Sequence, residues 1–215
     1  MAEFHLYGYA ESGPCYSCAL LLSMARAEWA PRFVDGFAGE TRSDAFLALN
    51  PMGEVPVLTH RGEHITQSGA ILDYLSALFG ICDPGRENGR EALRWLLWDN
   101  HKLSGQLGVW RYLLNFAPAD ARDPAVIAFV EERARRALHV LDGHLADRRW
   151  IATDWLTTVD LSCAAYLFFD DEIPVDWGGL PNISAWKDRI RAEDGWATPY
   201  DLMPRNAGRA AEAIT

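Results

Sequence analysis

The sequence predicts a chain of two domains, a small α/β domain followed by an all-helical domain. Strand-like and helix-like runs alternate in the first part of the chain, whereas the second part shows helical periodicity alone. Between them, residues 81–89 contain Pro84 and two glycines, a composition typical of a linker. We therefore expect domains over residues 1–80 and 90–203, followed by a tail at 204–215.

Length, composition and charge limit the classes of function. The 215 residues, 49% of them hydrophobic, can bury a sizeable core. The formal net charge of −10 argues against a nucleic-acid partner, which needs clustered Lys and Arg. There is no basic leader with an apolar core and no apolar run that could span a bilayer, so we expect no membrane partner. The four cysteines are too scattered for a disulfide framework, which predicts a reducing compartment and a cytoplasmic protein.

The elements expected in the first domain are a strand at 4–8, a helix at 15–28, a strand at 29–35, a helical turn at 46–49, a hairpin of 55–59 and 63–66, and a helix at 68–79. The first strand ends at the breaker Ser12-Gly13-Pro14. Pro56 cannot donate to a strand ladder, so it must open an edge strand or sit in a tight turn. This order of elements is that of a thioredoxin-like sheet.

The elements expected in the second domain are all helices: one at 90–116, one at 124–145, one that follows Thr157, and one that starts at Pro181. Thr157 and Asp160 have the spacing of a capping box, in which each residue caps the backbone of the other. Trp95 and Trp98 repeat at helical spacing, so we interpret them as core packing.

Two segments of the first domain together predict a site for an anion with an extended, peptide-like backbone. In the first, an Asn-Pro-Met-Gly turn at 50–53 precedes Val55 and Pro56. A cis bond at Pro56 would hold the amide and carbonyl of Val55 out of any ladder and offer them to a ligand. In the second, Ser68 can cap the following helix, which places unpaired N–H groups and a positive dipole end beside the same loop.

The Asn-Pro-x-Gly-x-Val-Pro-Val-Leu run at 50–58, followed by Gln67 and Ser68 at a helix start, resembles the glutathione-binding half of soluble glutathione transferases. The helical second half and its capping box are similar to the second domain of that family, so the resemblance spans nearly the whole chain. It implies a thioredoxin-like glutathione-binding domain, an all-α domain, glutathione as co-substrate, no metal, and a homodimer. The implied reaction is attack of the glutathione thiolate on an electrophilic, largely apolar second substrate, whose identity the sequence does not give.

Ser12 is the candidate catalytic residue. Thioredoxin-like redox proteins carry a Cys-Gly-Pro-Cys motif after the first strand, with the leading thiol at a helix N-terminus. Here Ser12 holds the leading position, as Ser-type glutathione transferases would have it. Its hydroxyl can donate a hydrogen bond to the glutathione thiolate, which lowers the pKa of that thiol and raises its reactive fraction. A serine that only caps the helix is the simpler alternative, but the two ligand segments favour the catalytic interpretation.

Cys15 and Cys18 form a Cys-x-x-Cys pair, which could indicate packing, a metal half-site or a redox dithiol. No second pair at finger spacing accompanies them, so we do not expect a structural metal. Both lie in an apolar predicted helix, where a cysteine usually acts as a small hydrophobe. Because Cys15 lies one turn from Ser12, a glutathione-dependent thiol reductase stays open as an alternative.

The resemblance also implies how the ligand would be held. Val55, which precedes Pro56, would pair its backbone with the cysteinyl part of glutathione. Ser68 and the helix start would hold the γ-glutamyl carboxylate, with Gln67 alongside.

Two positions depart from the pattern of the family. Many members carry an acid at the position of Gln67, and a neutral hydrogen bond there should weaken recognition of the γ-glutamyl ammonium. Glu54 stands where relatives often have Lys or Gln near the glycyl carboxylate, so we consider Arg42 as the cation that substitutes. On the long helix that faces a partner subunit in the family, Asp99 is a candidate contact to the partner's glutathione ammonium.

Other functions stay open on the sequence alone. The same thiolate could support an isomerisation, or thiol reduction through Cys15. From a different class, a transferase-like binding or scaffold protein without turnover would be consistent with the departures at Gln67 and Glu54.

Overall fold

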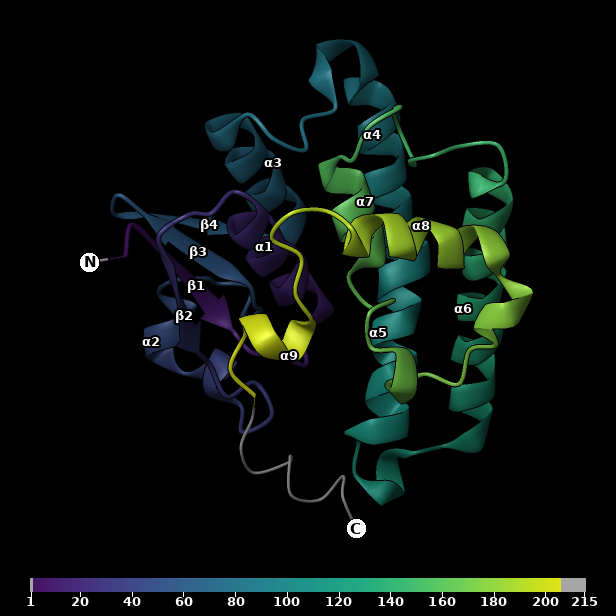
Figure 1. Cartoon of the computed structure of the whole chain (residues 1–215). Helices are drawn as coiled ribbons and strands as arrows, with labels where there is room; N and C mark the ends of the chain where they lie inside the picture. The colour runs from purple at the N-terminus through teal and green to yellow at the C-terminus, as the bar shows by residue number, and fades with distance from the viewer. Residues whose placement is uncertain (1, 206–215) are drawn as a thin grey trace. The chain divides into compact units, whose positions relative to one another are not determined.

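The computed structural model describes residues 2–205 and separates into two compact units (Figure 1). Unit 1 contains the chain up to Ile81 together with the segment that starts at Asp194, and unit 2 contains Cys82–Glu193. The prediction of an α/β domain with a thioredoxin-like order of elements and an all-helical domain is confirmed. The helical unit differs from the expected range of 90–203, since it starts earlier and the residues from Asp194 onward belong to unit 1.

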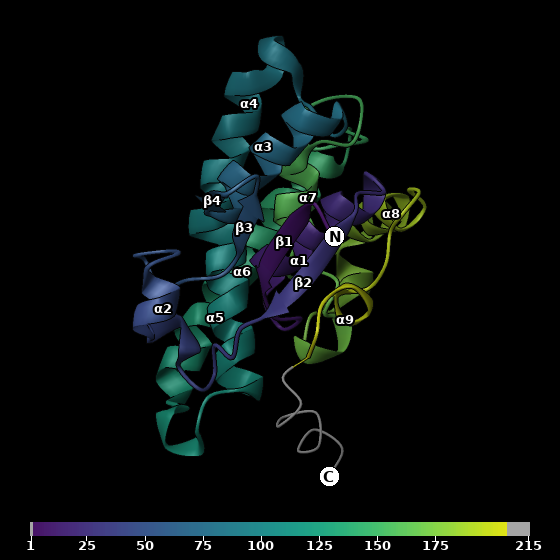
Figure 2. The ribbon, with the colours of Figure 1, turned by 90° about the vertical axis from the view of Figure 1, so that its left-hand side faces the viewer.

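Unit 1 is built on a mixed sheet of β1 (Phe4–Gly8), β2 (Trp29–Phe33), β3 (Val57–His60) and β4 (Glu63–Thr66), in the order β2-β1-β3-β4. β2 runs parallel to β1, whereas β3 is antiparallel to both β1 and β4. Tyr7 pairs with Val57, and Val57 pairs with Thr66. The end of β1, the start of β3 and the end of β4 therefore meet at one end of the sheet (Figure 2).

Helices cover both faces of this sheet. α1 (Gly13–Met24) and α3 (Ser68–Phe79) pack against each other on the face to which Leu58 points. The short α2 (Asp44–Leu47), which follows the 3₁₀ turn η1 (Glu40–Arg42), contributes to a smaller cluster on the opposite face. That cluster contains buried and half-buried apolar side chains: Tyr7, Val34, Phe46, Leu49, Val55 and Val57. Because successive strand residues point to opposite faces, each face has its own layer of core.

The chain returns to unit 1 at its C-terminal end. From Asp194 it runs to a short helix, α9 (Pro199–Leu202), which packs against α1 (Figure 1). Met203, which the sequence placed at the end of the helical domain, is only 3% exposed and belongs to unit 1. The rest of the predicted tail, from residue 206, lies outside the described residues.

Unit 2 contains α4 (Gly85–Trp98), α5 (Ser104–Asn115), α6 (Pro124–Leu145), α7 (Thr158–Ala164) and α8 (Pro181–Arg191). Short single turns lie between them: η2 (Asp99–Leu103), η3 (Ala119–Ala121), η4 (Asp170–Glu172) and η5 (Trp177–Gly179). α6 packs against both α5 and α8. None of the helices in the described part of the chain is both long enough and apolar enough to cross a lipid bilayer.

The single helix predicted at 90–116 is divided by the π-helical turn η2, and its first part starts earlier, at Gly85. The cause is local: Oδ1 of Asp99 accepts both the backbone N–H of Ser104, at 3.3 Å, and its hydroxyl, at 2.7 Å. Gly105 accommodates the wider turn, because a Cβ there would lie 2.6 Å from the carbonyl oxygen of Asn100. Such π-helical turns are not visible in a hydrophobic pattern.

The predicted capping box at the start of α7 is confirmed. Oδ2 of Asp160, which is fully buried, accepts the backbone N–H of Thr157 at 2.9 Å. Its Oδ1 accepts the indole N–H of Trp186 at 3.0 Å, which ties α7 to α8. The expectation that Trp95 and Trp98 pack is also confirmed, since their rings lie edge to face with centroids 5.0 Å apart.

Candidate ligand-binding site

The topology of unit 1 brings the predicted site residues to one end of the sheet. Ser12 follows the end of β1, Val55 precedes the start of β3, and Gln67 follows the end of β4. Those three strand ends lie side by side through the pairs Tyr7–Val57 and Val57–Thr66. The loop that contains Ser12 therefore lies at the same end of the sheet as the two ends of the β3–β4 hairpin, where Val55 and Gln67 are found.

Ser12 is the N-cap residue of α1. Its backbone is extended, and its Oγ accepts the N–H of Cys15 at 3.4 Å, a long contact. The backbone on either side is fixed, because the N–H of Ser12 donates to the Tyr9 carbonyl at 3.2 Å and its carbonyl accepts from Tyr16 at 3.0 Å. The hydroxyl thus sits at the positive end of a twelve-residue helix. A serine at this place can donate to an anion as well as cap the helix.

The segment before β3 is held open by a buried asparagine. The peptide bond between Val55 and Pro56 is cis, the geometry that the sequence analysis considered. Val55 makes no backbone hydrogen bond to another residue within the described range. Asn50, 1% exposed, accepts the N–H of Met52 at 3.1 Å and donates to the Glu54 carbonyl at 2.7 Å. Sequence reasoning treated Asn50 only as a turn residue and missed this role.

The start of α3 corrects one expectation. Ser68 is the first helical residue rather than the cap; Gln67 occupies the cap position and makes no side-chain capping bond. The first N–H groups of the helix consequently have no intrahelical acceptor, and the first backbone bond is from Ile71 to the Gln67 carbonyl, at 3.0 Å. Gln67 has φ of 68°, which is uncommon for a non-glycine residue and typical of functional sites. The thiol of Cys18 donates to the Ser68 carbonyl at 3.8 Å, which links α3 to α1.

Glu54 and Gln67, the two departures from the expected pattern, are in contact. Nε2 of Gln67 donates to Oε2 of Glu54 at 3.2 Å and approaches Sδ of Met52 at 3.1 Å. The side chains of Glu54 and Gln67 are exposed, so they lie on the open side of the site. A carboxylate is therefore present beside the start of α3, supplied by the neighbouring loop.

Arg42, considered as the substitute cation, lies next to that loop. A Cβ on Gly53 would come within 2.7 Å of Nη1 of Arg42, so the glycine provides the space that the guanidinium occupies. Gly53 also has φ of +65°, which glycine adopts readily. The Arg42 guanidinium is exposed and makes no ion pair with any residue from 2 to 205. It can therefore meet an anionic group of a ligand.

Asp99 is not available to a ligand, and the expectation that it contacts a partner's glutathione was wrong. The side chain is fully buried within unit 2. Both of its oxygens are engaged, Oδ1 by Ser104 and Oδ2 by the hydroxyl of Ser162 at 2.6 Å. Burial raises the pKa of Asp99, and these hydrogen bonds oppose part of the rise.

The cysteine pair is packed rather than reactive. Cys15 and Cys18 are completely buried. Burial raises the pKa of the Cys15 thiol to about 11, although hydrogen bonds with Ser12 and the Tyr9 backbone lower it in part. Burial likewise raises the pKa of Cys18 well above its ordinary value. Among the described residues no group of three or more His, Cys, Asp or Glu side chains could hold a metal ion.

Comparison with known proteins matches both parts of the chain to family models. Residues 2–77 match the glutathione S-transferase N-terminal domain and residues 111–194 the glutathione S-transferase C-terminal domain. Glutathione S-transferase GST-4.5 of Xanthomonas campestris is 31% identical, over 73% of this chain and 78% of the relative. The disulfide-bond oxidoreductase YghU of Escherichia coli is 30% identical, over 80% of this chain and 63% of the relative.

The fold is shared with solved structures of similar proteins. A possible glutathione S-transferase from Rhodopseudomonas palustris superimposes with a TM-score of 0.86 and 30% identity. The match covers 95% of this chain and 92% of that one. The likeness thus extends over both units and does not depend on the ligand segments alone.

Proposed function

This chain belongs to the glutathione S-transferase family, and we propose that it transfers glutathione to an electrophilic, largely apolar second substrate, with Ser12 as the group that stabilises the thiolate. One observation carries the proposal. The hydroxyl of Ser12, the start of α3 and the backbone of Val55, which is unpaired among the described residues, come together at one end of a single sheet. A hydroxyl donor suits the thiolate of a thiol-bearing tripeptide, and an extended backbone suits pairing with its peptide groups. The anion site at the helix start suits one of its carboxylates.

The proposed contacts follow from what each group can donate or accept. The N–H and carbonyl of Val55 would pair with the cysteinyl backbone, since neither makes a backbone hydrogen bond to another described residue. The γ-glutamyl carboxylate would accept from the N–H groups at the start of α3 and from the Ser68 hydroxyl, where the helix dipole favours negative charge. The ligand sulfur would then lie near the Ser12 hydroxyl, which donates to it.

Glu54 and Gln67 are proposed to act as a pair. The resemblance implies an acid at position 67 for the γ-glutamyl ammonium, and in this chain the negative charge beside Gln67 belongs to Glu54. The amide of Gln67 orients that carboxylate and can itself accept from the ammonium through its oxygen. At the glycyl end Arg42 is the proposed partner, because its guanidinium lies beside Gly53 without an ion pair to another described residue.

Calorimetric titration with glutathione, followed by a turnover assay with an activated chloronitrobenzene, tests this function. We expect saturable binding below millimolar concentration and formation of the thioether product. An absence of heat at millimolar glutathione would contradict the proposal and favour a scaffold without turnover. Binding without product formation would support glutathione recognition and contradict the proposed transfer reaction.

Thiol reduction is the second candidate, because the chain is also similar to a disulfide-bond oxidoreductase. A reductase that uses glutathione alone would need the same Ser12 site. A reductase that uses Cys15 as a second thiol is disfavoured, since that thiol is fully buried and its pKa is raised to about 11. Disulfide reduction that persists in a Cys15→Ser variant would assign the reaction to glutathione itself.

A homodimer is also proposed. Large apolar side chains are exposed on two helices of unit 2: Leu93 and Leu97 on α4, and Phe129 and Val140 on α6. Leu93 and Leu97 lie one helical turn apart, and exposed apolar patches are typical of protein interfaces. Sedimentation equilibrium should give a dimer for the natural chain and a shift toward monomer for Leu97→Glu. A monomeric natural chain at micromolar concentration would refute this assignment.

A further inference from the structure

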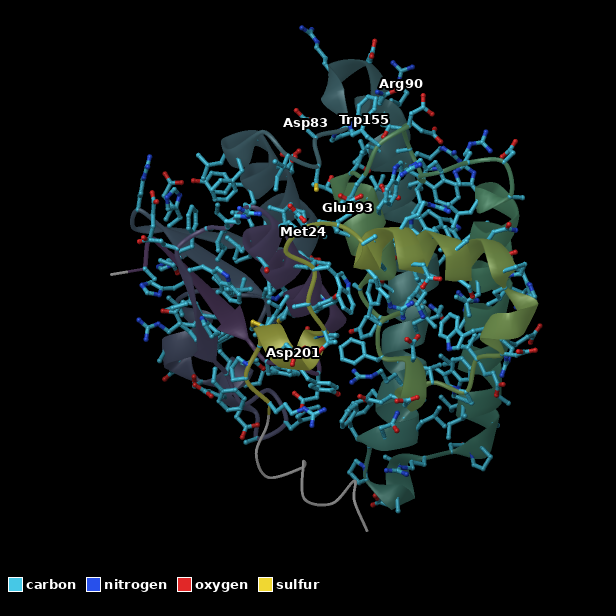
Figure 3. The ribbon with its side chains drawn as sticks, in the orientation of Figure 1. Met24, Asp83, Arg90, Trp155, Glu193 and Asp201 are labelled. Carbon is cyan, nitrogen blue, oxygen red and sulfur yellow. The ribbon has the colours of Figure 1, made fainter. Side chains whose placement is uncertain are left out.

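The C-terminal strap, defined here as residues 194–205, follows α1 closely from its last turn onward. At its beginning the carbonyl of Gly195 accepts the hydroxyl of Ser23 at 2.6 Å. A Cβ on Gly195 would lie 2.8 Å from both Cα of Met24 and the carbonyl oxygen of Ser23. Glycine at this position therefore allows two backbones to touch at the end of α1. Figure 3 shows the strap running between Met24 and α9, which carries Asp201.

The strap is tied to α1 a second time nearer the start of that helix. The hydroxyl of Tyr16, a completely buried residue, donates to the carbonyl of Ala197 at 3.0 Å. The next residues form α9, where the Thr198 hydroxyl donates to Asp201 at 2.6 Å. These contacts lead the chain back toward the first turn of α1.

The end of the strap reaches the segment that carries Ser12. The carbonyl of Pro204 accepts the N–H of Ala10 at 2.9 Å. Met203 is buried next to β1, and its Cε would lie 3.5 Å from a Cβ placed on Gly8. Two backbone hydrogen bonds therefore hold the tight turn from Tyr9 to Ser12. One joins the N–H of Ser12 to the carbonyl of Tyr9 within the turn, and the other joins Ala10 to the strap.

We propose that the C-terminal strap is a positioning element for the catalytic hydroxyl, acting through the bond between Ala10 and Pro204 and the packing of Met203. Ala10 is fully buried with the strap in place, and Pro204 supplies the backbone acceptor for its N–H, so removal of Pro204 breaks the bond that holds this turn. The turn would then relax, and the Ser12 hydroxyl at its end would move. A displacement of about 1 Å in a reacting group can lower a rate on the order of 100-fold.

The inference rests on the proposed function, and two truncations test it. The first ends at Leu202 and removes the contacts of Met203 and Pro204; the matched control ends at Arg205 and keeps them. With an activated chloronitrobenzene, we expect the first to lower kcat about 10-fold or more while the KM for glutathione stays within about 3-fold. We expect the control to equal the full chain.

A positioning role predicts a readout that simple loss of stability does not. The pKa of bound glutathione, taken from thiolate absorbance against pH, should rise in the truncation at Leu202 because the hydroxyl donor is misplaced. Equal loss in both truncations, or an unchanged kcat in the first, would overturn the proposal. If the first truncation does not fold, the full-length Met203→Ala variant takes its place under the same criteria.

Hydrogen exchange separates failure of this inference from failure of the proposed function. The Ala10 amide should be protected in the full chain and should lose protection in the truncation at Leu202, whether or not glutathione binds. Retained protection of the Ala10 amide in that truncation would refute the positioning role of the strap. A full chain with a protected Ala10 amide that neither binds nor conjugates glutathione would refute the proposed function alone.

Discussion

Replacing Ser12 with alanine tests the central chemical assignment. The change removes one hydroxyl and leaves α1, the cis-proline loop and the start of α3 in place. The contact from Oγ to the Cys15 N–H is long, at 3.4 Å, so the capping loss should lie at the low end of about 0.5–2 kcal/mol. Glutathione binding should change little, because none of the proposed carboxylate and backbone contacts involves this hydroxyl.

The size of the kinetic effect follows from the lost hydrogen bond. A hydrogen bond to a charged group contributes about 1.5–3 kcal/mol, which corresponds to a rise of roughly 1–2 pH units in the pKa of the bound thiol. Below that pKa the thiolate fraction would fall about 10- to 100-fold. A more basic thiolate is also a better nucleophile, with a Brønsted coefficient of about 0.4–0.5, so the net loss of turnover near neutral pH should be roughly 3- to 10-fold. Any displacement of the sulfur would add to that loss.

The assay is the pH profile of turnover with an activated chloronitrobenzene at saturating glutathione. In the Ser12→Ala variant, the fall of turnover at low pH (the acid limb) should begin at a higher pH. Above both pKa values the turnover of the variant should equal or exceed that of the natural chain, because its thiolate is the more basic nucleophile. Ser17→Ala is the matched control: it removes a buried hydroxyl from the same helix, one that donates to the Pro14 carbonyl at 3.0 Å. The control should lose stability without a shift of the acid limb.

One outcome would refute the reasoning. If Ser12→Ala keeps both the acid limb and the turnover of the natural chain, the hydroxyl does not contact the sulfur. Ser12 would then be a helix cap, and another group would stabilise the thiolate. A parallel loss at all pH values would point instead to displacement of the ligand.

Three further predictions concern other residues. Glu54→Gln should weaken glutathione binding about 5-fold, as expected for an exposed charge contact worth about 1 kcal/mol, and adding Gln67→Glu should restore it; calorimetry measures both. Cys15→Ala should keep transfer activity within about 3-fold, and iodoacetamide should not label Cys15 in the native protein at pH 8, because a pKa of about 11 leaves roughly one thiol in a thousand ionised. Asp99→Asn should gain stability relative to the natural chain as pH rises from about 4, measured by urea unfolding. The folded pKa of Asp99 is raised, so its favourable contribution is complete below the unfolded value near 4 and is lost as pH passes through the folded value.

The parts of the site that sequence could predict depend on local chemistry. Pro56 cannot join a ladder, and a serine after a strand that precedes a helix must lie near the helix start, so these positions follow from short segments. The contact between Glu54 and Gln67 follows from the register of the predicted hairpin, which brings the residues before β3 and after β4 together, but the two residue types considered separately do not show it. Sequence reasoning therefore examined the two residues one at a time and counted both as departures.

Burial and helix distortion were similarly beyond the local pattern. Asp99 lies in a helical run with polar neighbours and was considered for ligand contact, yet the π-helical turn directs it toward Ser104 and Ser162. The strap was missed because few of its contacts come from apolar side chains. Its bonds at Ala197 and Pro204 use backbone carbonyls, which every residue has and no sequence pattern distinguishes.

The formal net charge of −10 raises the question of how the proposed site would attract an anionic tripeptide. Charges that lie farther from the site than the screening length of about 8 Å at physiological salt act weakly on a bound ligand. What remains is local: the start of α3 offers roughly half a positive charge, and Arg42 offers a full one beside Gly53. Glu54 would repel a carboxylate but attracts an ammonium. The site can therefore favour a ligand that carries its ammonium at one end and a carboxylate at each, which is the charge pattern of glutathione.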